Sequence, residues 1–150
     1  MQELTLVPRP LYPYETWQAI TSPPTLEVVP KKGWGGVFWN SHPTFIKTQW
    51  DRFAELYEES QNQSLESGEK IMLVRCVCVA DTYEEAVESV RPGHDEMWKF
   101  LGPYGWSKGY MGPDGKPSKA GLIPTLEESL EQKIWIVGSA DDVGEQIEWY

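Results

Sequence analysis

Residues 71–80 read IMLVRCVCVA, a run that is apolar at every position except Arg75. A strand that is apolar on both of its alternating faces is typical of a parallel sheet covered by helices on both sides. The next residues, 81–85, read DTYEE and open a helix in which Thr82 and Glu85 form a capping box. The stretch therefore predicts a strand followed directly by a helix, which is the repeating unit of α/β folds.

The same alternation extends upstream of this junction. We expect strands at 16–21 and 35–39, each followed by a helix. The first helix begins after Ser22 and ends at Pro30, and the second has an apolar stripe with helical spacing. That stripe is formed by Ile46, Trp50, Phe53 and Tyr57.

Downstream, the helix that begins after Thr82 is expected to break at Pro92, and a short helix is expected at 97–101. Residues 102–124 are rich in Gly and Pro and predict a long irregular insert. Thr125 and Ser139 then cap two further helices, with a strand at 134–137 between them. The order predicts parallel βαβ units, either in an open doubly wound sheet or in an arc of a (β/α)8 barrel.

Composition narrows the class of protein. The chain has 150 residues, which predicts one domain over 1–150, and a formal net charge of −10. That charge argues against nucleic acid and anionic membrane surfaces as partners. Cys76 and Cys78 lack the further ligands of a metal site, so we expect buried, reduced thiols, no metal and a cytoplasmic location. No apolar run is long enough to span a membrane.

In either architecture, ligands bind at the carboxyl ends of the strands. Three such ends carry polar residues: Thr21-Ser22, residues 39–42 and residues 80–82. Ser22 and Thr25 are candidates for holding a phosphate with their hydroxyls and the amides of the following helix. The alternative is an ordinary helix cap, and the residues alone do not decide between the two.

Trp39 and Asn40 offer a wall and a hydrogen-bonding edge for a flat aromatic ligand, or else a core Trp beside a turn. Arg75 calls for an anionic partner, either a ligand or a structural carboxylate, unless it lies on an exposed strand edge. His42 is a candidate general acid, or a surface loop residue. We expect His94 to be a solvated residue at a helix start.

Several segments, in this order, resemble the luciferase-like, flavin-dependent monooxygenases. The similarity covers nearly the whole chain, but only the middle and later part of such a protein. The segments are 17–23 (WQAITSP), 33–39 (GWGGVFW), 79–86 (VADTYEEA), 100–107 (FLGPYGWS) and 136–139 (IVGS).

The resemblance implies a partial (β/α)8 barrel, incomplete at both ends, and the cofactor FMN. Reduced flavin, supplied by a reductase, reacts with O2 to oxygenate a small organic substrate such as an aldehyde or ketone. The resemblance places the FMN phosphate at Ser22 and Thr25 and the isoalloxazine near Trp39, and we include the adjacent strand-end residues Thr21 and Asn40 in the predicted cofactor site. Catalytic residues stay unassigned, because the strands that carry the family's active-site His have no counterpart here.

Three hypotheses follow from these observations. The first is an FMN-dependent monooxygenase present as a truncated or fragmentary member, whose activity alone the sequence leaves open. The second is a non-enzymatic flavin-binding or interaction module that dimerises, or takes up a complementing chain, through open strand edges. The third is a free-standing enzyme on a doubly wound sheet that uses His42, Asp81 and Arg75.

Overall fold

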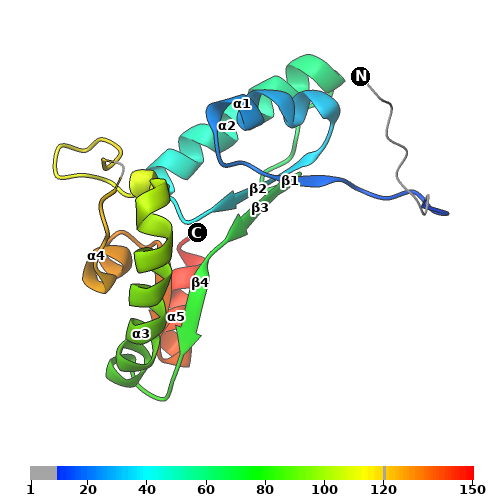
Figure 1. Cartoon of the computed structure of the whole chain (residues 1–150). Helices are drawn as coiled ribbons and strands as arrows, with labels where there is room; N and C mark the ends of the chain where they lie inside the picture. Colours follow the sequence, from blue (N-terminus) through cyan, green and yellow to red (C-terminus); the bar gives the residue numbers. More distant parts are fainter. Residues whose placement is uncertain (1–9, 120) are drawn as a thin grey trace.

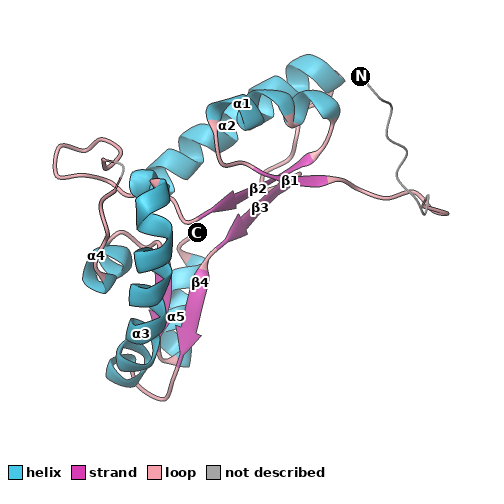
Figure 2. Ribbon diagram, in the orientation of Figure 1, coloured by secondary structure: helices cyan, strands magenta, loops and turns pink. Residues whose placement is uncertain are grey.

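The computed structural model describes residues 10–119 and 121–150, and it alternates strands with helices (Figure 2). Short 3-10 turns lie at 30–32, 102–104 and 106–109. In chain order the strands and helices are β1 (Trp17–Ala19), α1 (Pro23–Val28), β2 (Gly35–Trp39), α2 (Pro43–Gln61), β3 (Ile71–Val74), β4 (Cys76–Val79), α3 (Tyr83–Leu101), α4 (Leu126–Glu131), β5 (Trp135–Gly138) and α5 (Ala140–Glu148).

The strands form two parallel sheets joined at Arg75. One sheet has the order β1-β2-β3 and the other pairs β4 with β5. In both sheets each strand lies beside its neighbour in the chain, whereas a doubly wound sheet reverses its order at a switch point. The described strands therefore give no support to the doubly wound alternative, and they define an α/β fold with sequential parallel strands.

Each sheet has its own hydrophobic core, and the chain bends where β3 passes into β4 (Figure 1). Helices α1 and α2 cover one face of β1–β3, with Phe38 and Phe53 fully buried between them. Helices α3 and α5 pack against β4 and β5, where Trp98, Ile134 and Val137 are buried. The expected apolar stripe of α2 is confirmed, since Ile46, Phe53 and Tyr57 are buried and Trp50 is half-buried.

The prediction that the strand at 71–80 is covered on both faces is wrong. In β3, Ile71 and Leu73 face the core under α2, and in β4, Cys76 and Cys78 face the core under α3. The alternation shifts by one residue at Arg75, so a regular two-residue period does not run through the segment.

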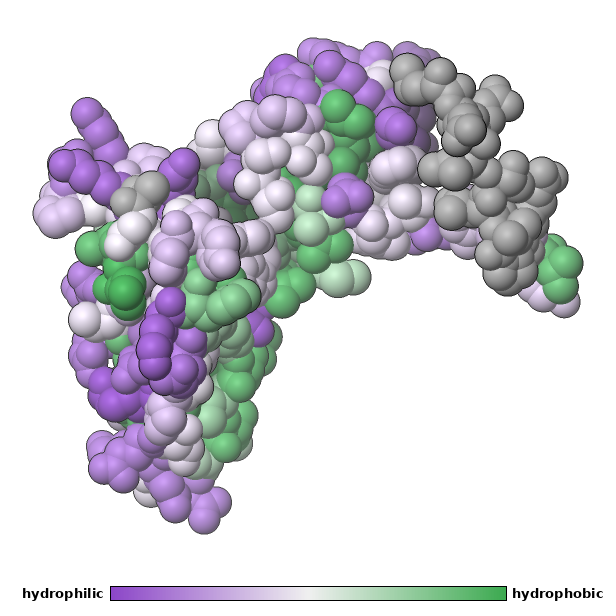
Figure 3. All heavy atoms as spheres, in the orientation of Figure 1, coloured by the Kyte–Doolittle hydropathy of each residue, from purple (hydrophilic) through white to green (hydrophobic). Residues whose placement is uncertain are grey.

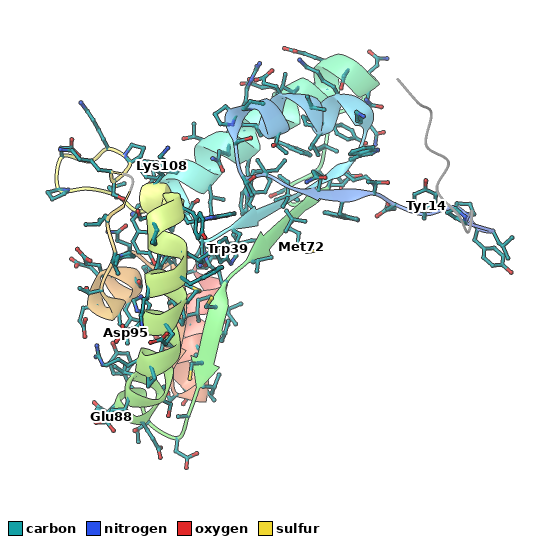
Figure 4. The ribbon with its side chains drawn as sticks, viewed as in Figure 1. Tyr14, Trp39, Met72, Glu88, Asp95 and Lys108 are labelled. Carbon is teal, nitrogen blue, oxygen red and sulfur yellow. The ribbon has the colours of Figure 1, made fainter. Side chains whose placement is uncertain are left out.

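The other residues of these strands form an apolar surface that we call the open strand face. It consists of Met72, Val74, Val77 and Val79, which are 46%, 37%, 51% and 53% exposed. Met72 projects away from α1 and α2 (Figure 4), and hydrophobic atoms line the inner side of the bend (Figure 3). Contiguous exposed apolar surface of this kind marks a site of interaction.

Helix α3 is continuous from Tyr83 to Leu101, so the predicted break at Pro92 is wrong. Proline removes one backbone hydrogen bond and disfavours a helix interior. Here the helix buries Ala86 before the proline, and His94 and Trp98 after it, with each side chain 0% exposed. Burial on both sides of Pro92 stabilises one long helix.

The predicted helix caps are largely confirmed. Thr125 with Glu128 and Ser139 with Asp142 each form a reciprocal capping box. Thr82 accepts a hydrogen bond from the Glu85 amide. No described helix is long and apolar enough to cross a membrane.

Candidate functional site

Of the three predicted strand ends, those of β1 and β2 lie side by side at the carboxyl end of the same sheet. Ala19 pairs with Val37, and the Ile20 amide donates to the Val37 carbonyl, so Thr21 follows β1 beside the end of β2. The third end, at Asp81-Thr82, lies beyond β4. At about 3.3 Å per residue it is about 20 Å along the strand from Arg75. The structure therefore does not bring Asp81 to the other two ends.

Ser22 and Thr25 form a hydroxyl pair at the start of α1. Their side-chain oxygens lie 2.9 Å apart, and the Thr25 amide donates to Ser22 Oγ over 3.4 Å. Pro23 and Pro24 carry no N–H, which removes two of the donors that a helix start usually offers. The pair caps the helix, and Ser22 is exposed and able to meet a ligand.

Trp39 and Asn40 end β2 beneath the Gly-rich insert. The rings of Trp39 and Trp106 meet edge to face with centroids 5.3 Å apart. A Cβ at Gly109 would lie 2.7 Å from the Asn40 backbone oxygen, so only glycine allows the insert to approach this closely. Asn40 is 3% exposed and adopts a left-handed conformation with φ 44°.

Arg75 lies beside this strand end, because Trp39 pairs with Val74. Its Nη2 donates to the Ser41 carbonyl over 2.8 Å, and its Nε donates to the Tyr150 hydroxyl over 3.0 Å. Its guanidinium also lies over the Tyr150 ring, 5.1 Å from the centroid. No described carboxylate forms an ion pair with Arg75. The structural salt bridge considered from the sequence is therefore not found among residues 10–119 and 121–150.

His42 caps α2 instead of lying in a free loop. Its Nδ1 accepts a hydrogen bond from the Thr44 amide over 3.2 Å, which requires the neutral ring. Burial, with the Arg75 charge as a second cause, holds the pKa of His42 below its ordinary value. The cap and the lowered pKa both favour the neutral ring over the protonated ring that a general acid requires.

This arrangement predicts a pH effect on stability. An unfolded His42 titrates near its ordinary pKa of about 6.5, whereas the folded one titrates lower. As pH falls below about 6.5, the unfolded state takes up a proton first, so stability falls. We expect His42→Asn, which keeps a capping oxygen and does not titrate, to reduce the drop in Tm between about pH 7.5 and 5.5. Parallel pH profiles of the two proteins would contradict this role of His42.

A second polar group, which the sequence did not predict, lies inside the core of α3, α4 and β5. His94 Nε2 lies 2.8 Å from Ser129 Oγ, which lies 2.8 Å from the Tyr110 hydroxyl. Each of the three residues is at most 1% exposed, so the prediction of a solvated His94 is wrong. Burial raises the pKa of Tyr110, which keeps its hydroxyl protonated. Because all three side chains are shielded from solvent and bonded to one another, we assign them a structural role.

A cavity of about 670 Å³ lies elsewhere, between α2 and the end of the chain. Trp50, Trp149 and Tyr150 are among its lining residues, and none of the five predicted cofactor residues is. Among the described residues no group of three or more His, Cys, Asp or Glu side chains is placed to hold a metal ion.

Sequential parallel strands that alternate with helices place the chain among α/β proteins. The family model described as luciferase-like monooxygenase matches residues 1–150. The chain therefore belongs to the luciferase-like monooxygenase family, and the resemblance found in its sequence is confirmed. Comparison with curated proteins gives no significant match.

A solved structure shows the same fold. It is a type II Baeyer–Villiger monooxygenase, the oxygenating constituent of 3,6-diketocamphane monooxygenase from the CAM plasmid of Pseudomonas putida, in complex with FMN. The TM-score is 0.66 with 20% sequence identity, and the match covers 89% of this chain. It covers 37% of that chain, so the present chain spans well under half of its length.

Proposed function

We propose that the chain forms part of an FMN-dependent monooxygenase that oxygenates a small organic substrate with O2. The observation that carries the proposal is the shared carboxyl end of β1 and β2, where Thr21 and Ser22 follow β1 and Asn40 follows β2, within a chain of the luciferase-like family. FMN, reduced by a separate reductase, supplies the oxygen-activating chemistry when it is bound.

In this proposal one group of residues binds the phosphate of FMN and another binds its ring. The Ser22 and Thr25 hydroxyls, together with the amides near Thr25, hold the phosphate at the exposed start of α1. Trp39 provides a flat wall, and the buried amide of Asn40 lacks a hydrogen-bond partner among the described residues, as expected of a group that meets a ligand. The insert packs against this place, with Trp106 beside Trp39 and Gly109 against the Asn40 backbone.

We further propose that the chain is an arc of a (β/α)8 barrel, with 102–124 as an insert within the single domain. In a closed barrel each strand pairs on both edges and side chains fill the interior. The open strand face, and the edge of β1 that has no partner strand among residues 10–119 and 121–150, are the surfaces that the remaining strands would cover. The polypeptide that covers them belongs to the same protein, to a second copy, or to a complementing chain.

One observation favours a second candidate function, a flavin-binding module that dimerises and does not turn over. The open strand face is apolar and exposed in this chain, which is sufficient for association without catalysis. A stable dimer that binds FMN and shows no oxygenation with supplied reduced flavin would favour this candidate.

The phosphate role is tested with Ser22→Ala combined with Thr25→Ala. We expect FMN to bind about 10-fold more weakly, because two hydrogen bonds to a charged phosphate are lost. Riboflavin, which has no phosphate, should bind the variant as it binds the unmodified chain. Thr125→Ala is a matched control, because it removes a capping hydroxyl far from the proposed site. Unchanged FMN affinity in the double variant would mean that the two hydroxyls act only as a helix cap.

A further inference from the structure

Two side chains at the junction of β2 with β3 and β4 keep polar atoms without partners among the described residues. Asn40 leaves both Oδ1 and Nδ2 without a hydrogen bond of ordinary geometry although the residue is 3% exposed, and the Cys76 thiol, a weak hydrogen-bonding group, lies near its amide. Arg75 leaves Nη1 buried and unpaired, while its other nitrogens are used. Native structures leave few such atoms, because each one loses its hydrogen bonds to water without replacement. The junction therefore offers two donors and one acceptor to a ligand.

These atoms belong to neighbouring positions. The parallel register ends with Trp39 paired to Val74, and Asn40 and Arg75 are the next residues of the two chain segments. The hydrogen bond from Arg75 to the Ser41 carbonyl shows that the guanidinium reaches the residue after Asn40. Trp39, which precedes Asn40, supplies an aromatic wall with Trp106 at its edge.

The unpaired atoms of Asn40 and Arg75 indicate which chemical group of a ligand could bind here. A lone carboxylate or phosphate accepts from Arg75 and from Asn40 Nδ2, but it leaves Asn40 Oδ1 without a donor. A planar imide, –CO–NH–CO–, presents an acceptor, a donor and a second acceptor along one edge. The Asn40 amide pairs with the first two, and the guanidinium pairs with the second carbonyl.

We infer that Asn40 and Arg75 bind the imide edge of the pyrimidine part of the flavin ring, with Trp39 as its aromatic wall. This inference rests on the proposed function and deepens it, because it makes Arg75 a cofactor-binding residue. Gly109 packs against the Asn40 backbone oxygen, so this part of the insert must move aside for the ring to enter before it can cover the bound ring. A cation held at this edge also stabilises negative charge on the ring, which tunes its reactivity.

The test uses Arg75→Met, Arg75→Lys and Asn40→Asp, with two matched controls. Arg52→Met removes a charge from an exposed surface ion pair. Asn62→Asp makes the same change at another left-handed Asn, with φ 54° against 44° for Asn40. FMN and riboflavin are titrated into each protein in the form that binds FMN, either the chain alone or the chain with the polypeptide that supplies the remaining strands. Tm without flavin checks folding.

We expect Arg75→Met and Asn40→Asp to weaken FMN and riboflavin equally, by about 10-fold. Both controls should bind as the unmodified chain does. Sulfite adds to bound oxidised flavin, and this addition bleaches the visible absorbance of the flavin. The adduct carries negative charge on the pyrimidine part of the ring. Arg75→Met should therefore need more sulfite for bleaching, and Arg75→Lys, which keeps the charge, should need less than Arg75→Met.

Other outcomes overturn the inference in distinguishable ways. Unchanged affinity and unchanged sulfite titration in Arg75→Met and Asn40→Asp would overturn it while leaving the proposed function intact. Weaker FMN binding with unchanged riboflavin binding would place Arg75 at the phosphate and would overturn it as well. No flavin binding by the unmodified chain in either form would overturn the proposed function together with the inference.

Discussion

Replacing Trp98 with alanine should lower the free energy of unfolding by about 3–5 kcal/mol, the range for truncating a large buried aromatic side chain. Trp98 is 0% exposed and meets Tyr110 edge to face, with ring centroids 5.1 Å apart. It joins α3 to the insert and to β5, so the cavity left by its removal opens in the centre of this core. Typical domains are stable by about 5–15 kcal/mol, and the variant should be marginal at room temperature.

Urea unfolding followed by far-UV circular dichroism measures the effect. Phe100→Ala is the matched control, because Phe100 lies on the same helix two residues away and is 67% exposed. Its free energy of unfolding should change by less than about 1 kcal/mol. Equal losses in the two variants would mean that α3 does not continue past Pro92 with the orientation described.

The second large effect concerns association through the open strand face. We expect the unmodified chain, when no other polypeptide covers this face, to form a dimer in solution. Val77→Asp combined with Val79→Asp should weaken the dimer at least about 100-fold, because a carboxylate buried without a partner costs several kcal/mol. The monomer itself should tolerate the change, since both valines are more than half exposed.

Size-exclusion chromatography with light scattering distinguishes the two masses. Val28→Asp is the control, because Val28 is 49% exposed on α1, away from the open strand face. A monomeric unmodified chain, or a double variant that remains dimeric, would show that this face is not the interface.

The sequence predicted interactions correctly where both interacting groups lie within one short segment. The caps at Ser22, Thr125 and Ser139 are examples, since each side chain bonds to an amide three residues away. The strand at 35–39 and the stripe of α2 were also predicted, because their patterns match one structural period.

The sequence did not predict features that depend on contacts between residues far apart in the chain. Helix α3 continues through Pro92 because Trp98 and His94 are buried against β5 and α4, which no local pattern reveals. The shift at Arg75 was hidden because residues on both faces of 71–80 are apolar, so a one-residue change of alternation leaves no mark. Asp81 is separated from the other strand ends because β4 continues beyond Arg75 and pairs with β5.

The predicted cofactor residues also could not be assessed fully from local sequence. Ser22, Thr25, Trp39 and Asn40 were selected by their places at strand ends and by resemblance, and the structure adds the unpaired amide of Asn40. The contribution of Arg75 could be judged only from its surroundings, where it has a hydroxyl and a carbonyl as partners and no described carboxylate.

The central claim, that this chain contributes an FMN site, is tested most directly by equilibrium titration of FMN followed by quenching of its fluorescence. The titration is made with the chain alone and with the polypeptide that supplies the remaining barrel strands. We expect saturable binding of one FMN per chain when the barrel is complete, with riboflavin bound more weakly because it lacks the phosphate. The absence of saturable FMN binding even with the complete set of strands would contradict it.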